Sequence, residues 1–199
     1  PYDPKCPVLC MDEQPVQLVK ETRKPIPATV KHPRRVDYEY ERAGTASIFM
    51  FTEPLAGWRE ATARPTKTKV DWAIEMARLL DGRYQKCEKV ILVCDNLNTH
   101  TKGAFYEAFA PSQAREYARR IEFCHTPKHG SWLNIAENEL SSMTRQCLGS
   151  DRMGDLKMLR KRIRAWSADV NRNQRGVDWQ MKVDDARYKL KSVYPKIKM

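Results

Sequence analysis

Short apolar runs and their spacing predict strands in the first half of the chain. The runs Cys6–Met11, Ala46–Phe51 and Trp58–Ala63 are too short for helices, and turn residues join the last two. We therefore expect an antiparallel meander. Four prolines among basic residues predict an irregular segment over about 14–42. The continuous apolar run Lys89–Cys94 predicts a strand buried on both faces of a sheet.

Helical spacing dominates the rest of the chain, where apolar residues recur three and four positions apart. The predicted elements are a helix from a cap at Thr66 or Thr68 to about Leu80, one or two helices over Gly103–Arg120 broken at Pro111, a short strand Ile121–Cys124, a helix Asn134–Leu148, and a long basic helix Leu156–Asn173 capped by Asp155. This order predicts an α/β fold with a mixed central sheet and helices on both faces. We expect one domain over 1–199, with a core at about 6–150 and a basic helical region at about 151–199.

The charge balance indicates a polyanionic partner. Lysine and arginine number 36 against 25 acidic residues, which gives a net charge of +11. No apolar run approaches the ~20 residues of a membrane span, so we expect no membrane partner and a cytoplasmic location. The six cysteines are expected to be reduced thiols, because Cys6 and Cys10 lack the second Cys or His pair of a zinc site.

Two aspartates follow the apolar strands. Asp12 comes after VLCM and Asp95 after VILVC, and ligands gather at the carboxyl ends of strands in open α/β sheets. If the strands are neighbours, the two carboxylates repel, and a hard cation such as Mg²⁺ or Mn²⁺ removes that repulsion. The alternative is that each aspartate only begins a turn.

The segment NIAENEL supplies the third acid. Glu137 and Glu139 lie two positions apart on a helix, so only one can face the aspartates. Glu137 is in helical phase with the start of the helix at Asn134, which favours it. Glu139 is expected to be a solvated surface residue.

Three stretches together resemble the catalytic core of mariner-like DDE transposases, and in particular their bacterial insertion-sequence branch. They are CMDEQ (Cys10–Gln14), VCDNLNTH (Val93–His100) and HTPKHGSWLNIAE (His125–Glu137). The resemblance runs from about Val8 to Leu148 and implies an RNase H-like fold with about five strands. It further implies a metal-binding triad of Asp12, Asp95 and Glu137 that holds two Mg²⁺ or Mn²⁺ ions, with Asp12 between them.

The function that this resemblance implies is hydrolysis at transposon ends followed by strand transfer of the 3′-OH into target DNA. The implied partners are double-stranded DNA and a second copy of the chain, at the bacterial nucleoid. Family members carry helix-turn-helix modules upstream of the first catalytic strand, and we expect this chain to lack one because it begins almost at that strand.

Further residues are candidates for supporting the acids or for contacting DNA. The candidates in loops can equally stabilise the turns of their own loop or be solvated. A run of basic residues is usually a solvated face of the protein. A core or hinge residue that anchors the helix is the favoured interpretation of the tryptophan, with base stacking as the alternative. The candidates are Asn96, Asn98, His100, Lys128, His129, Trp132, Arg34, Arg35, Lys157, Lys161 and Arg164.

Two other functions stay open on the sequence. The first is an RNase H-like nuclease that hydrolyses nucleic acid without strand transfer. The second is a catalytically silent remnant that binds DNA through its basic surface. A glycosidase with paired carboxylates is a weaker alternative, because it explains neither the basic charge nor the histidine-rich loop.

Overall fold

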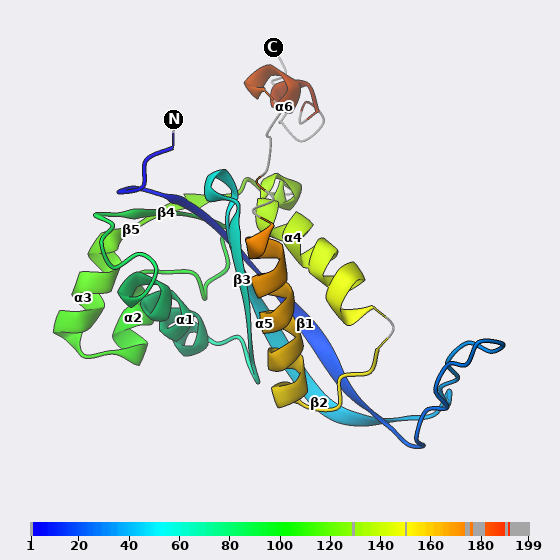
Figure 1. Cartoon of the computed structure of the whole chain (residues 1–199). Helices are drawn as coiled ribbons and strands as arrows, with labels where there is room; N and C mark the ends of the chain where they lie inside the picture. The colour runs from blue at the N-terminus through cyan, green and yellow to red at the C-terminus, as the bar shows by residue number, and fades with distance from the viewer. Residues whose placement is uncertain are drawn as a thin grey trace, which may run out of the picture.

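A mixed β-sheet forms the centre of the molecule (Figure 1). The computed structural model describes residues 2–128, 130–149, 151–173, 176, 182–189 and 191. Within these residues, five strands form one sheet in the order β3-β2-β1-β4-β5. β1, β2 and β3 are the expected antiparallel meander, and β4 and β5 run parallel to β1. The strands are β1 (Val8–Glu21), β2 (Tyr40–Glu53), β3 (Trp58–Arg64), β4 (Val90–Cys94) and β5 (Ile121–His125).

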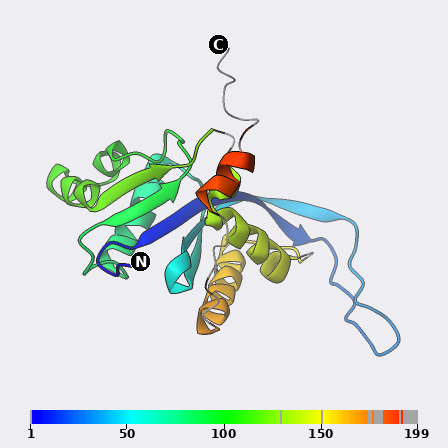
Figure 2. The same cartoon turned by 90° about the horizontal axis from the view of Figure 1, so that it is seen from above.

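Helices cover both faces of the sheet, as the resemblance implies (Figures 1 and 2). Successive residues of β1 point to opposite faces. Leu9 and Met11 pack in the cluster under α1 (Lys69–Asp81), α2 (Gly103–Ala108) and α3 (Pro111–Arg120). Cys10 packs in the cluster under α4 (Ile135–Met143), the π-helical turn η3 (Thr144–Leu148) and α5 (Leu156–Arg172). Short helical segments also occur at η1 (Pro54–Ala56), η2 (Ser131–Leu133) and α6 (Val183–Lys189).

Capping residues mark the helix starts that the sequence predicts. Thr68 accepts from Asp71 N, and the Asp71 side chain accepts from Thr68 N in return, which closes a capping box at the start of α1. Asp155 caps α5 and Asn134 caps α4. The break at Pro111 separates α2 from α3 as expected. Across the described residues, no helix combines the length and apolar character needed to cross a bilayer.

The first two strands are longer than the sequence predicts. The expected irregular segment 14–42 is wrong at both of its ends, because β1 continues to Glu21 and β2 begins at Tyr40. Their ladder stabilises polar residues that show no apolar pattern of their own. Only residues 22–39 lie outside it, and we call them the arm. The arm is closed by a bridge between Ile26 and Arg35 and protrudes from the body (Figure 2).

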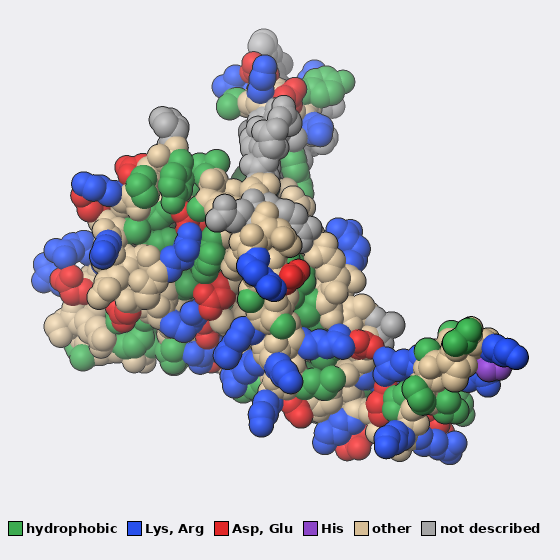
Figure 3. Space-filling model, viewed as in Figure 1, with side chains coloured by type: hydrophobic (Ala, Val, Ile, Leu, Met, Phe, Trp, Pro, Cys, Tyr) green, Lys and Arg blue, Asp and Glu red, His purple; other side chains and the backbone are tan. Residues whose placement is uncertain are grey.

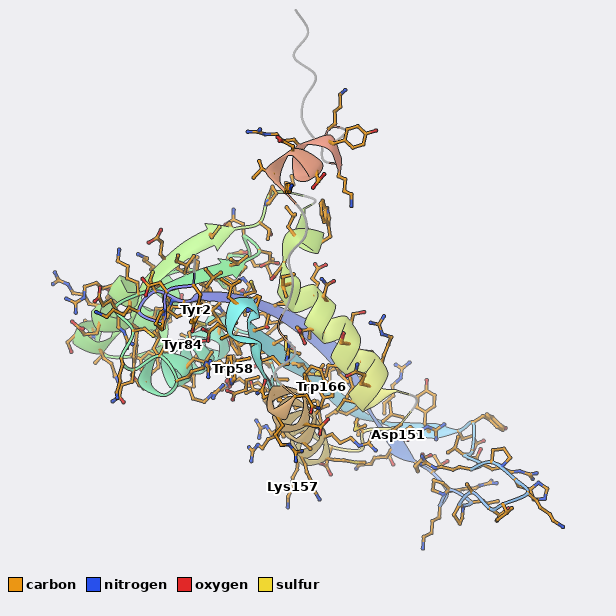
Figure 4. The ribbon with its side chains drawn as sticks, turned by 45° about the horizontal axis from the view of Figure 1, so that its top comes forward. Tyr2, Trp58, Tyr84, Asp151, Lys157 and Trp166 are labelled. Carbon is orange, nitrogen blue, oxygen red and sulfur yellow. The ribbon has the colours of Figure 1, made fainter. Side chains whose placement is uncertain are left out.

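The base of the arm is tied to the start of α5. Asp151 pairs with Arg34 of the arm at 2.8 Å and with Arg162 of α5 at 2.6 Å. These two arginines hold the pKa of the Asp151 carboxyl below its usual range. Figure 4 shows Asp151 at this junction, with Lys157 of α5 pointing away from the body. Arg34 is therefore engaged within the protein.

Polar side chains of α5 cover the exposed edge of β3. The outward N–H and C=O groups of an edge strand are otherwise available to a strand from another molecule. Here α5 supplies partners for four of them. The contacts run from Asn171 Nδ2 to Arg59 O (2.7 Å), from Arg59 N to Asn171 Oδ1 (2.9 Å), from Ala61 N to Ser167 Oγ (3.1 Å) and from Arg160 Nε to Ala63 O (2.8 Å).

Candidate active site

Asp12 lies in the middle of β1, at the point where β1 separates from β4. The parallel pairing of the two strands covers only Val8–Cys10 against Ile91–Val93. The prediction that Asp12 ends its strand is therefore wrong, although it does follow the last residue that pairs with β4. Asp95 follows directly after β4, as expected. The two acids thus stand at the opening between two diverging strands.

The start of α4 is fixed to β1 by a buried asparagine. The Asn134 side chain is 2% exposed, and its Nδ2 donates to Met11 O at 2.8 Å. Its Oδ1 accepts from Ala136 N at 3.1 Å and so caps the helix. Asn134 therefore joins the first turn of α4, which carries Glu137, to the residue before Asp12. Sequence analysis proposed no role for its side chain; the signal for it is the cap position three residues before a predicted ligand.

Two acids from distant positions in the chain act on the titration of Asp12. Burial is the main cause that raises the pKa of Asp12, and a hydrogen bond from Glu13 N opposes the rise. Together with the negative charges of Glu137, Asp95 and Glu13, burial brings this pKa to about 6. Across the residues that the structure describes, neither Asp12 nor Glu137 has a salt bridge to a basic side chain. Of the three acids, Asp95 is therefore the one with a basic side chain at ion-pair distance among the described residues, the His100 ring at 2.8 Å.

These acids are neighbours, but they are not closed around a single point. Over the described ranges, no three His, Cys, Asp or Glu side chains form a ready-made metal site. Carboxylate oxygens are nevertheless the donors that hard divalent cations prefer, and a cation would relieve the repulsion that raises the Asp12 pKa. The donor set therefore fits Mg²⁺ or Mn²⁺ by its chemistry.

A cavity of about 450 Å³ opens beside Asp12 and Glu137. Thr144 of η3 and Gln14 of β1 hold each other at its wall through reciprocal side-chain hydrogen bonds of 3.1 and 3.2 Å. Arg145 also lines the cavity and is exposed. Arg145 is not among the residues predicted from the sequence; its place about two turns beyond Glu137 in the same helical segment is the signal that could have found it.

His100 is the most deeply engaged of the predicted supporting residues. Its Nε2 lies 2.8 Å from Glu13 Oε1 and its Nδ1 lies 2.8 Å from Asp95 Oδ1. Burial alone would lower the pKa of His100, but hydrogen bonds to Cys94 and Glu13 outweigh it and raise the pKa to about 10. The role of Glu13 was not predicted. Side chains of adjacent residues in a strand point to opposite faces of the sheet. This alternation is the signal that could have predicted different neighbours for Glu13 and Asp12.

Glu139 corrects a prediction. It was expected to be solvated, but its side chain is 12% exposed and forms a two-pronged ion pair with Arg59 of β3, at 2.9 Å for each contact. Arg59 is 2% exposed. Helical phase correctly separated Glu137 from Glu139, but it gave no information on a partner 80 positions away. Glu139 joins α4 to the sheet and stands apart from the acidic cavity.

The remaining candidates fall into three groups. Asn96, Asn98 and Lys128 are exposed on loops near the end of the sheet, and His129 lies outside the described residues. Trp132 is 39% exposed, so it is not a core residue, and its role as a hinge residue stays a prediction. The basic side chains of α5 are exposed opposite its buried stripe, as predicted; they are Lys157, Lys161 and Arg164.

Comparison with solved structures identifies the same fold in transposase complexes. The chain is similar to the Mos1 mariner paired end complex with Mn (16% identity, TM-score 0.52, covering 81% of this chain and 48% of that one). It is also similar to the Mos1 Strand Transfer Complex (16% identity, TM-score 0.54, 82% and 48%) and to a pre-cleavage Mos1 transpososome (18% identity, TM-score 0.52, 81% and 48%). The chain thus spans about half the length of these proteins.

A comparison of sequences identifies the family. No curated protein matches the chain. The sequence profile described as "DDE superfamily endonuclease" matches residues 7–160, a range that contains the whole sheet, α4 and all three candidate acids. This chain therefore belongs to the DDE superfamily of endonucleases.

Proposed function

We propose that this chain is the catalytic domain of a DDE transposase, which cleaves phosphodiester bonds at transposon ends and joins the freed 3′-OH to target DNA. The observation that carries the proposal is that Asp12 and Glu137 line one cavity, and that the charges of Glu137 and Asp95 both raise the pKa of the partly buried Asp12 carboxyl. Three acids separated by up to 125 positions in the chain are therefore neighbours, in the family whose members are endonucleases.

Membership of this family implies divalent metal ions. We assign two such ions, Mg²⁺ or Mn²⁺, to Asp12, Asp95 and Glu137. When bound, such ions lower the pKa of an attacking water and neutralise charge on the phosphate. Asp12 must be ionised to act as a ligand, so its raised pKa makes binding weaken as the pH falls towards 6. Arg145, at the same cavity, is suited to hold a phosphate of the substrate strand.

Double-stranded DNA is the proposed partner, both as transposon ends and as target. The exposed basic face of α5 supports this proposal, because Lys157, Lys161 and Arg164 make no ion pair within the described part of the chain. In Figure 3, lysine and arginine side chains gather over α5 and along the arm. The Mos1 structures are named as paired-end and strand-transfer complexes, and we extend a paired assembly on DNA to this chain.

A plasmid assay tests the proposal. The full chain is incubated with supercoiled plasmid in Mg²⁺ or Mn²⁺, and separately with plasmid and an oligonucleotide that carries a free 3′-OH. We expect metal-dependent nicking and joining of the oligonucleotide. Asp95→Asn should abolish both, whereas Asp169→Asn, which changes an exposed acid on α5, should leave both intact.

Each result of this assay separates one function from the others. Nicking without joining identifies a nuclease that lacks strand transfer. DNA binding with neither reaction identifies a catalytically silent protein. Nicking that persists in Asp95→Asn shows that the three acids are not the catalytic site.

A further inference from the structure

A buried pair of side chains connects the strand that carries Asp12 to the loop that carries Asp95. Glu13 and His100 are 4% and 1% exposed in their side chains, and Nε2 of the histidine lies 2.8 Å from Oε1 of the glutamate. The other ring nitrogen lies 2.8 Å from Asp95 Oδ1. One imidazole therefore lies within 2.8 Å of two carboxylates, one on β1 and one in the loop after β4.

The ring of His100 has little freedom to move. It packs against Trp72 of α1, with the ring centroids 5.9 Å apart, and its backbone N–H donates to Leu97 O at 3.0 Å. The Asp95 side chain, in contrast, is 39% exposed and lies past the end of β4. A fixed ring thus lies against a carboxylate beyond the end of its strand, whose Oδ1 is buried and has no hydrogen bond of normal geometry among the described residues.

The pleat of β1 points the side chains of two adjacent acids in opposite directions. Asp12 and Glu13 both line the cavity beside Glu137, and the carboxylate of Glu13 also meets His100. Since the ladder between β1 and β4 ends at Cys10, no backbone pairing holds these two strands together at the level of the acids. The contact from Glu13 through His100 to Asp95 spans that opening.

We propose that Glu13 and His100 form a positioning clamp that holds the Asp95 carboxylate in the orientation required to bind a divalent cation. The clamp rests on the proposed function, because it acts on a proposed ligand. Neither residue of the clamp is itself a ligand or a catalytic group. Groups that orient metal ligands in this way typically contribute about 10- to 100-fold to metal affinity.

The test measures Mn²⁺ affinity of the full chain by titration calorimetry, together with thermal unfolding. We expect His100→Gln and Glu13→Gln each to weaken binding about tenfold or more. The double variant should lose little beyond either single variant, because both changes break the same contact. Glu13→Asp keeps the carboxylate and should retain part of the affinity, and it serves as the second variant if Glu13→Gln does not fold.

Two controls separate the clamp from simpler effects. Removing the negative charge of Glu13 weakens cation binding through electrostatics alone. Replacing His100, which is positive or neutral, cannot weaken cation binding in this way. A loss of affinity in His100→Gln therefore reports orientation rather than charge. Trp72→Phe keeps an aromatic ring against His100 and both polar contacts of the clamp, so it should alter stability and leave Mn²⁺ affinity unchanged.

The outcomes distinguish the clamp from the function on which it rests. If the wild-type chain does not bind Mn²⁺, the proposed function is wrong and the clamp is overturned with it. If the wild type binds Mn²⁺ and a folded His100→Gln variant binds equally well or better, the clamp alone is overturned. The clamp is likewise overturned if Trp72→Phe weakens binding as much as His100→Gln does.

Discussion

Replacing Asp12 by asparagine should stabilise the metal-free protein while it abolishes cleavage. Asp12 is partly buried, and its pKa rises from 3.8 to about 6 through burial and the charges of Glu137 and Asp95. Keeping this carboxylate ionised at pH 7.5 therefore costs up to about 3 kcal/mol, since one pKa unit corresponds to about 1.4 kcal/mol. Solvent that reaches the group screens part of this, so we expect a gain of about 1–2 kcal/mol for Asp12→Asn.

The sign of the pH dependence follows from linkage. Between pH 3.8 and about 6 the folded chain binds more protons at Asp12 than the unfolded chain does, so the wild type loses stability as the pH rises through this range. Asp12→Asn has no such group. Its advantage should therefore be full above pH 6 and absent below about pH 4. The asparagine can still accept the hydrogen bond from Glu13 N, so that contact is kept.

Urea unfolding and thermal unfolding in EDTA at several pH values measure this difference in the free energy of unfolding. Because 1 kcal/mol corresponds to about 2–4 °C for a chain of this size, the melting temperature of Asp12→Asn at pH 7.5 should lie about 2–8 °C above that of the wild type. The control Asp169→Asn changes an exposed aspartate and should stay within about 0.5 kcal/mol of wild type. An advantage that is absent at pH 7.5, or that is equal at pH 4 and pH 7.5, would refute the assignment of a raised pKa to Asp12.

Three further substitutions test the framework around the site. Asn134→Ala removes a helix cap and a buried contact to β1, so it should lower the free energy of unfolding in urea by about 1–2 kcal/mol and also reduce nicking. A loss of stability without a loss of nicking would exclude a positioning role for Asn134. Glu139→Gln leaves the buried charge of Arg59 with weaker compensation and should cost about 3 kcal/mol, and an unchanged melting curve would contradict this. Asn171→Ala removes two hydrogen bonds to the edge of β3, so it should lower the free energy of unfolding by about 1–3 kcal/mol and promote self-association, which light scattering detects. A monomeric, equally stable variant would show that the edge strand does not need these hydrogen bonds.

Local signals in the sequence predicted the helices well, because caps at Thr68 and Asp155 are read from neighbouring residues. The choice of Glu137 as the third acid rests on the phase of its own helix and stays a prediction. The resemblance to mariner-like transposases supplied the number of strands, about five, but not their order, which no local pattern contains. The finer assignment to the bacterial branch stays a prediction.

Contacts between distant parts of the chain account for what the sequence did not predict. The extension of β1 to Glu21 depends on pairing with β2, and its polar residues give no apolar alternation. The burial of Glu139 depends on Arg59, and the role of Glu13 depends on His100, 87 positions away. In each case the partner became visible only when the elements were packed together.

The pleat of β1 restricts how the length of this chain can change during evolution. One inserted residue before Asp12 would exchange the faces of Asp12 and Glu13 and also turn Leu9 or Met11 out of its core cluster, so a single codon would disturb both the chemistry and the packing. The arm carries no such constraint, because its side chains are largely exposed and lie beyond the last pair of the ladder. Insertions and deletions among homologous genes should therefore accumulate past Glu21 and be absent upstream of Gln14.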